Sequence, residues 1–168
     1  TTFEVCIPVS AEHATAHLAA SATADTGDVP PSGNGELILI VDDESDVRTM
    51  TAAVLMQYGY RVLLAADGTE AVSIYAQRSD EISAVLTDIL MPVVDGIALC
   101  RVLRKMNPEV CLIVASGYAD ESRTLELRAL NVRTVLNKPF SAGILLTTLG
   151  KALATECATF PKPALRCA

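Results

Sequence analysis

Short apolar runs alternate with helical patterns between residues 36 and 155. After each run, apolar residues recur at i, i+3 and i+4, which is the spacing of a helix that buries one face. The first and fourth runs, LILIV and CLIVA, are apolar throughout, as expected of strands covered on both faces. The pattern predicts five strand–helix units, with strands at residues 37–41, 61–65, 84–87, 111–115 and 132–136 and helices ending near residues 59, 78, 106, 130 and 154.

This alternation is typical of a parallel sheet with helices on both of its faces. We therefore predict an α/β fold with a doubly wound, five-stranded parallel sheet. Asn131 is placed to end the fourth helix in the left-handed conformation. Helical spacing also predicts buried faces on two helices, formed by Val47, Met50, Val54 and Leu55 in the first and by Ile97, Cys100, Leu103 and Met106 in the third.

Polar residues follow four of the five predicted strands. They are Asp42, Asp43, Asp88, Ser116 and Lys138. Ligands of open α/β sheets bind beyond the carboxyl ends of the strands, so we expect these side chains to converge. Carboxylates about 5 Å apart repel by roughly 3 kcal/mol per pair at an effective dielectric constant near 20. Such a cluster either holds protons or binds a cation, and hard oxygen ligands with open positions suit Mg²⁺. One remaining carboxylate could then attack phosphorus, while the hydroxyl and the ammonium group compensate charge.

Four segments then show a family resemblance. ILIVDDE, LTDILMPVVDG, VASGY and LNKPF occur in this order, and together they resemble the receiver domain of response regulators and hybrid histidine kinases over about residues 36–155. The resemblance implies a flavodoxin-like strand order, 2-1-3-4-5. It also implies a phospho-accepting domain of a two-component phosphorelay, in which phosphorylation switches the interaction with a partner.

The resemblance further implies a role for each acid. Asp88 would accept the phosphoryl group from a phospho-His donor. Asp43 and Asp88 would bind Mg²⁺ together with the backbone carbonyl of Leu90, and Asp42 would act through metal-bound water. The domain would catalyse its own phosphorylation and dephosphorylation, whereas the ATP site and the phospho-accepting His of a kinase are not among these residues.

Ser116 would be the switch hydroxyl and Lys138 the phosphate contact, and the bond after that lysine is often cis in the family. The partner face of the family would include Leu125, Val135 and Leu145 here. This chain departs from the family pattern in two places, and each departure changes what the resemblance implies about the switch. The family often has a switching aromatic ring at the position of Val135, so this chain lacks that ring. Leu90 and Tyr118 stand two residues beyond Asp88 and Ser116, beside the expected water path, and predict a long-lived phosphoryl group.

The flanking residues suggest a hybrid sensor histidine kinase. TTFEVCIP resembles the last strand of a histidine-kinase ATP-binding domain, so residues 1–10 are interpreted as the remnant of that strand. Residues 11–35 are rich in Ala, Thr, Ser, Gly and Pro, which predicts a flexible linker. We interpret residues 36–155 as the receiver domain, at the C-terminal end of such a kinase, and residues 156–168 as a loose tail.

Charge and composition limit the classes of partner that this chain is expected to bind. A formal net charge of -7 argues against nucleic acid and against direct contact with an anionic membrane. No run of 18 apolar residues is present. The five cysteines show no zinc-like spacing and are interpreted as reduced thiols of a cytoplasmic protein, with Cys100 and Cys111 in the core. The expected partners are the phospho-His domain of a histidine kinase, in the parent chain, a His-phosphotransfer protein, and a second copy in a homodimer.

Three other functions compete with this interpretation. A pseudo-receiver would bind partners without phosphorylation, but the acids, Ser116 and Lys138 are all present. A haloacid dehalogenase-type phosphatase needs an acid two residues after its nucleophile, where this chain has Leu90. A flavodoxin-like flavin binder needs a Ser-, Thr- or Gly-rich anion cradle after the first strand, where the acidic sequence DDESD stands.

Overall fold

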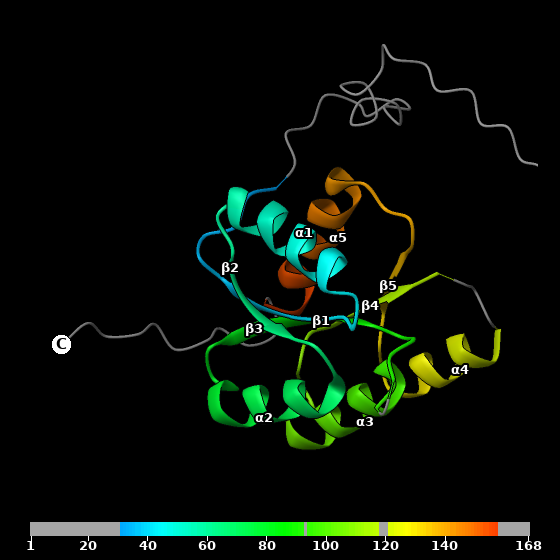
Figure 1. Cartoon of the computed structure of the whole chain (residues 1–168). Coiled ribbons are helices and arrows are strands. Elements are labelled where there is room, and N and C mark those ends of the chain that lie inside the picture. The colour runs from blue at the N-terminus through cyan, green and yellow to red at the C-terminus, as the bar shows by residue number, and fades with distance from the viewer. Residues whose placement is uncertain (1–30, 93, 118–120, 158–168) are drawn as a thin grey trace, which may run out of the picture.

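The computed structural model describes residues 31–92, 94–117 and 121–157. Within these ranges, five strands form one sheet in the order β2-β1-β3-β4-β5, and all neighbours are parallel (Figure 1). The strands are β1 (Leu37–Val41), β2 (Arg61–Ala65), β3 (Ile82–Asp88), β4 (Leu112–Ser116) and β5 (Thr134–Asn137). The helices are α1 (Ser45–Gln57), α2 (Gly68–Arg78), α3 (Gly96–Met106), α4 (Glu121–Ala129) and α5 (Ala142–Cys157). The predicted fold and strand order are confirmed.

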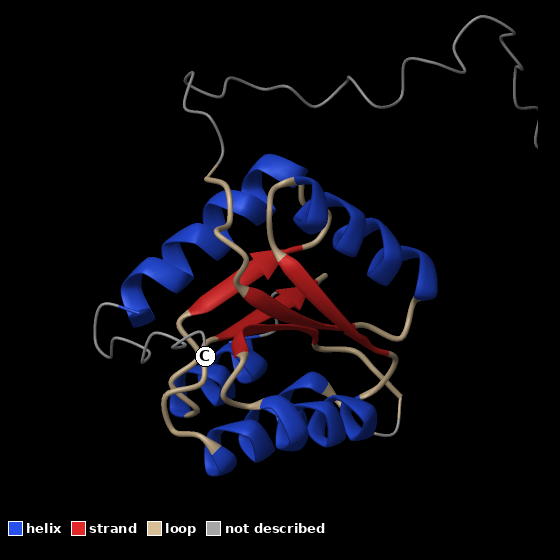
Figure 2. Cartoon of the chain, turned by 90° about the vertical axis from the view of Figure 1, so that its left-hand side faces the viewer, coloured by secondary structure: helices blue, strands red, loops and turns tan. Residues whose placement is uncertain are grey.

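Helices cover both faces of the sheet and divide the core into two layers (Figures 1 and 2). All five residues of β1 are buried. Leu37, Leu39 and Val41 pack in the layer that contains α2, α3 and α4, whereas Ile38 and Ile40 pack in the layer of α1 and α5. Because side chains alternate between the faces of a strand, a strand covered on both sides must be apolar at every position.

The parallel arrangement determines where the polar strand ends lie. Since every strand runs in the same direction, the carboxyl ends share one edge of the sheet. The pairing there joins Val41 to Thr87, Asp88 to Ala115, and Ser116 to Asn137. The loops that start at this edge therefore carry the candidate functional residues.

The predicted helix faces are right in part. Asn131 has a φ of 56° and ends α4 as predicted. Met50 and Met106 were expected to be buried, and both expectations are wrong, because their exposed fractions are 68% and 43%. In α1 the smaller neighbours of Met50 turn toward the sheet, and Met106 is the last residue of α3. The buried residues of α1 are Thr51, Ala52 and Leu55.

The end of the expected linker contacts the domain. The N–H of Gly33 donates to the carbonyl of Tyr58 at 2.7 Å, and the N–H of Gly35 donates to the carbonyl of Gly59 at 3.0 Å. A Cβ at position 33 would lie 2.5 Å from the ring of Tyr60, so only glycine fits there. Residues 31–35 thus lie against the turn between α1 and β2.

Several expectations concern residues outside the described ranges. These are the strand at residues 1–10, the linker from residue 11 to residue 30, Tyr118, and the tail after residue 157. Among the residues that the structure does describe, no helix has the length and apolar character needed to cross a bilayer.

Candidate functional site

Three carboxylates meet where β1 and β3 end. Oxygen atoms of Asp42, Asp43 and Asp88 all lie within 4.8 Å of one another. Asp42 and Asp88 are buried, with exposed fractions of 5% and 8%, whereas Asp43 is exposed to solvent. The N–H of Glu44 donates to Oδ1 of Asp42 at 2.9 Å, which orients this carboxylate as the chain turns into α1.

The local backbone positions Asp88. Its Oδ1 accepts a hydrogen bond from the N–H of Ile89 at 2.8 Å. Its carbonyl faces Gly96, at which a Cβ would lie only 2.0 Å from that oxygen. The N–H of Gly96 also donates to the carbonyl of Ile89 at 3.0 Å. The start of α3 therefore packs directly on the end of β3, and this contact requires glycine.

Lys138 provides the positive charge of the site. Its Nζ lies 2.9 Å from Oδ2 of Asp42 and 3.2 Å from Oδ2 of Asp88. Burial alone lowers the pKa of Lys138, but the hydrogen bond to Asp42 and the charges of both acids raise that pKa above its usual value. The backbone N–H of Lys138 donates to the carbonyl of Ser116 at 2.7 Å, and the bond to Pro139 is cis.

Ser116 and Leu90 flank Asp88. Ser116 is the last residue of β4 and is 8% exposed. The N–H of Ile89 donates to the carbonyl of Ala115 at 3.1 Å, so the strand ends that carry Asp88 and Ser116 lie side by side. The side chain of Leu90 is 58% exposed just beyond the acid.

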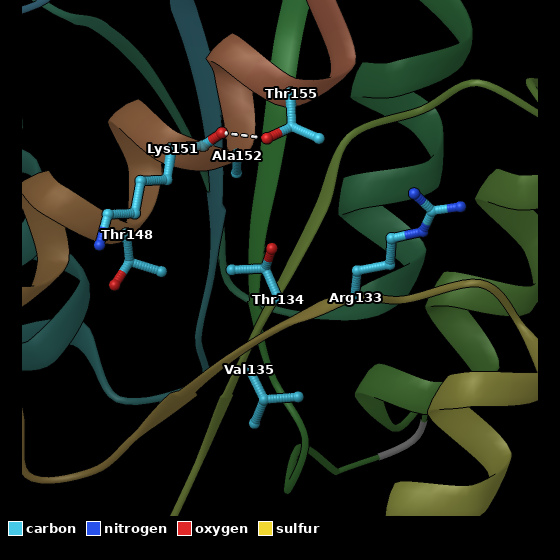
Figure 3. Close-up of a pocket in the computed structure, with 7 residues that line it drawn as sticks. All are labelled: Arg133, Thr134, Val135, Thr148, Lys151, Ala152 and Thr155. Carbon is cyan, nitrogen blue, oxygen red and sulfur yellow. Dashed lines mark hydrogen bonds between the residues drawn. The ribbon is translucent and has the colours of Figure 1, made fainter.

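Val135 does not join the acidic cluster. It pairs with Val114 in the ladder, is 41% exposed, and lines a groove between β5 and α5 (Figure 3). The structure therefore separates the position of the missing aromatic ring from the three acids. Tyr118, which was expected to flank the water path, lies outside the described residues.

Two contacts were missed at the sequence level. Lys138 was expected to contact phosphate, but here it bridges Asp42 and Asp88. Arg48, which was not considered, donates from its guanidinium to the carbonyl of Asp42. An arginine in the first turns of a helix is common, so its spacing from Asp42 alone carries no signal.

The donor set fits a hard divalent cation. The three carboxylates and the single ammonium group carry a formal charge of -3 + 1 = -2. Carboxylate oxygens are the ligands that Mg²⁺ and Ca²⁺ prefer, and Mg²⁺ binds through few carboxylates while it retains water molecules. The cluster is therefore suited to hold a metal ion, with Asp43 on its solvent side.

Comparison with known proteins identifies the family to which this chain belongs. The model of the response regulator receiver domain matches residues 38–150. The chain is 39% identical over 116 residues to the sensor kinase CckA of Brucella abortus, an alignment that covers 69% of this chain and 12% of that protein. It spans less than half of the transcriptional regulators that it matches, with shares of 47% and 43% for two of them.

Solved structures agree with the sequence match. A receiver domain protein from Clostridium thermocellum superposes with a TM-score of 0.70 at 27% identity, covering 74% of this chain and 98% of that one. CheY from Borrelia burgdorferi, in a complex with CheX, BeF3 and Mg²⁺, gives a TM-score of 0.66 at 26% identity, covering 68% and 87%. The sequence match, the fold and the position of the acids agree, and the chain belongs to the response regulator receiver domains of two-component signalling.

Proposed function

We propose that Asp88 accepts a phosphoryl group from phospho-His in a Mg²⁺-dependent transfer, and that this modification switches a partner interaction. The observation that carries the proposal is the environment of the Asp88 carboxylate. Oδ1 is oriented by the N–H of Ile89, Oδ2 lies 3.2 Å from the ammonium of Lys138, and two more carboxylates lie within 4.8 Å.

Asp43 and Asp88 would hold the metal ion, with the backbone carbonyl of Leu90 as a further ligand and Asp42 bound through water. When bound, Mg²⁺ would neutralise negative charge on the phosphoryl group and on the acids. The complex of CheX with CheY from Borrelia burgdorferi contains BeF3 and Mg²⁺ together with a related fold, which supports this assignment.

The chain's own residues would divide the chemistry as follows. An oxygen of Asp88 attacks phosphorus, the P–N bond of phospho-His breaks, and its electron pair remains with the imidazole. The ammonium of Lys138 already lies beside Asp88 and would compensate charge on the transferred oxygens, and the hydroxyl of Ser116 would donate to another of them. Asp88 needs no base, because a carboxylate is already a nucleophile.

The organisation of the whole protein follows from the same proposal. The donor would be the phospho-His domain of a histidine kinase in the parent chain, and the next acceptor a His-phosphotransfer protein. Residues 1–10 would be the last strand of the kinase's ATP-binding domain. Residues 11–35 would be a linker whose last residues, 31–35, pack against the domain. Of the expected tail at residues 156–168, the first two residues belong to α5, and the tail would follow that helix. The site would act in the cytoplasm. The match to a sensor kinase over residues of this domain supports this arrangement.

A second function, partner binding without phosphorylation, is disfavoured. Burying carboxylates beside a lysine costs desolvation free energy. A pseudo-receiver, which is not phosphorylated, would have no use for such a buried cluster. Phosphatase turnover of free substrates is disfavoured as well, because an exposed Leu90 occupies the position of the required acid.

Incubation with acetyl phosphate and Mg²⁺, followed by intact mass measurement, tests the proposal. The wild type should gain one phosphoryl group, and Asp88→Asn should gain none. Asp80→Asn, which removes an exposed acid elsewhere, should label like the wild type. Equal labelling of Asp88→Asn, or labelling that persists without divalent ions, would reject the assignment.

A further inference from the structure

Arg48 contacts the backbone on both sides of Asp43, the exposed acid of the cluster. Its guanidinium donates to the carbonyl of Asp42, six residues earlier in the chain. Its backbone N–H donates to the carbonyl of Glu44 at 3.0 Å, at the start of the helical ladder of α1. Arg48 therefore holds the carbonyls of the residues immediately before and after this acid.

The carbonyl of Asp42 lies just beyond the ladders that β1 forms with its neighbours. The pairing of β1 with β2 and with β3 ends at Val41. The N–H of Asp42 still donates to the carbonyl of Ala65 at 3.3 Å, but among the described residues no backbone N–H donates to the carbonyl of Asp42. An unpaired carbonyl in a buried residue costs free energy, and Arg48 supplies the donor.

The side chain of Asp43 depends on this backbone for its position. Among the described residues, its carboxylate accepts no hydrogen bond and forms no ion pair. Asp42 and Asp88 differ in this respect, because each accepts a hydrogen bond from a backbone N–H and both contact Lys138. The direction in which the Asp43 carboxylate points is therefore set by the turn that Arg48 ties to α1.

The guanidinium of Arg48 uses a backbone carbonyl where an acid was available. Glu44 and Asp46 stand in the same stretch of chain, yet among the described residues Arg48 forms no ion pair. Its side chain is instead half-buried against the carbonyl of Asp42. Hydrogen bonds from an ionised donor are about twice as strong as neutral ones, so this contact can hold the turn in one position.

We propose that Arg48 is a positioning residue for the divalent metal site. It fixes the turn from β1 to α1, so that a carboxylate oxygen of Asp43 stays within 4.8 Å of those of Asp42 and Asp88. This inference rests on the proposed function, in which Asp43 is a metal ligand. Removal of a group that holds a metal ligand in place commonly weakens metal binding by about 10- to 100-fold.

The sign of the effect separates positioning from electrostatics. A cation near three acids competes with a metal ion, so the loss of its charge alone would tighten Mg²⁺ binding. The loss of the hydrogen bond would weaken Mg²⁺ binding, because the exposed acid would no longer be held beside its neighbours. Arg48→Met removes both the charge and the donor but keeps a long side chain that favours a helix. Weaker binding in this variant therefore reports positioning.

The test is a calorimetric titration of the full chain with MgCl₂ at constant ionic strength. Because the two effects oppose each other, we expect Arg48→Met to raise the Kd by about three- to tenfold. Arg48→Lys retains a charged donor without the planar fork and should recover part of the loss. Urea unfolding verifies that each variant is folded at the temperature of the titration.

Arg61→Met is the matched control. Nε of Arg61 also donates to a backbone carbonyl, that of Gly35 at 2.9 Å. Arg61 is the first residue of β2, however, so it lies at the opposite end of the sheet from the acids. The control loses a charge and a bond of the same kind, and it should keep the wild-type Kd to within about twofold because salt screens distant charges.

A second measurement is the rate at which acetyl phosphate labels Asp88 at increasing Mg²⁺ concentration. Arg48→Met should need about three- to tenfold more Mg²⁺ for half-maximal labelling and should reach the wild-type rate at saturation. A lower rate at saturation with an unchanged Mg²⁺ dependence would overturn the proposal, since a general loss of structure has that effect.

Mg²⁺ binding by Arg48→Met that equals or exceeds that of the wild type would also overturn the proposal, as would an equal loss in Arg61→Met. Such results, with labelling of the wild type and none of Asp88→Asn, would reject the role of Arg48 and leave the proposed function intact. A wild type that fails to bind Mg²⁺ would reject both.

Discussion

Lys138 and Asp42 form an ion pair with Nζ and Oδ2 2.9 Å apart, across the sheet edge from β5 to β1. The exposed fractions of the two side chains are 22% and 7%, so solvent screens this pair less than a surface pair. The same ammonium lies 3.2 Å from Asp88. The lysine therefore contacts two of the carboxylates that would hold a divalent ion, and its charge offsets part of their mutual repulsion.

Lys138→Ala should tighten Mg²⁺ binding, because it removes a positive charge from the acids. We expect a roughly three- to tenfold lower Kd, since partial exposure reduces the Coulomb term to about 1 kcal/mol. The variant should nevertheless accept phosphoryl groups more slowly, as it loses charge compensation. Calorimetric titration with MgCl₂ measures the first effect. Lys105→Ala is the control, and weaker metal binding by Lys138→Ala would contradict the prediction.

Gly96→Ala should destabilise the domain by at least about 2 kcal/mol. The added Cβ would lie 2.0 Å from the carbonyl oxygen of Asp88, which belongs to the backbone and has little room to move. Gly117→Ala, which meets no atom within 4 Å, should change stability by less than about 1 kcal/mol. Urea unfolding compares the two variants. Equal stabilities would show that α3 does not pack on β3 as described.

Leu90→Asn should shorten the lifetime of the phosphoryl group. An exposed apolar side chain beside Asp88 cannot orient water, whereas an amide in its place can donate and accept hydrogen bonds. Decay of the phosphorylated protein, followed by mass measurement over time, checks this expectation. Leu125→Asn changes a leucine of similar exposure, 65%, on α4 and should not alter the decay. If the lifetime were unchanged in Leu90→Asn, the proposed role of Leu90 in slowing loss of the phosphoryl group would be rejected.

The stabilising effect of Cys100 should decline in alkaline solution. Burial raises the pKa of this thiol from 9.0 to about 12, so the folded chain retains the proton more strongly than the unfolded chain. Stability from this group is fully present below pH 9 and is lost as the pH rises toward about 12. The difference in unfolding free energy between wild type and Cys100→Ala should therefore be constant below pH 9 and shrink above it. If the difference in unfolding free energy between the two proteins stayed constant up to about pH 11, the raised pKa of Cys100 would be contradicted.

Removal of residues 1–35 should lower stability below that of a chain that lacks only residues 1–30. The longer deletion eliminates the hydrogen bonds of Gly33 and Gly35 to the turn after α1 and exposes the ring of Tyr60, which is now 4% exposed. Each lost hydrogen bond contributes about 1 kcal/mol. Thermal unfolding of the two truncated chains provides the comparison, and identical melting temperatures would show that the segment is dispensable.

Much of the site could be predicted because its residues follow strands. The five apolar runs determine a parallel sheet, and a parallel sheet brings its carboxyl ends to one edge. Asp42 follows β1 and Asp88 ends β3, so the rule that parallel strands end at the same edge is enough to predict that the two acids lie close together. The exposure of Met50 could not be predicted in this way, because its hydrophobicity suited burial while the smaller Thr51 and Ala52 fit against the sheet.

The sequence by itself determined the doubly wound sheet, the acids at its edge and the match to receiver domains. These follow from periodicity and from short motifs, which are local properties of the chain. Only the tertiary structure decided that Lys138 bridges Asp42 and Asp88. Such contacts depend on side chains far apart in sequence, whose distances are set by how helices and strands pack together.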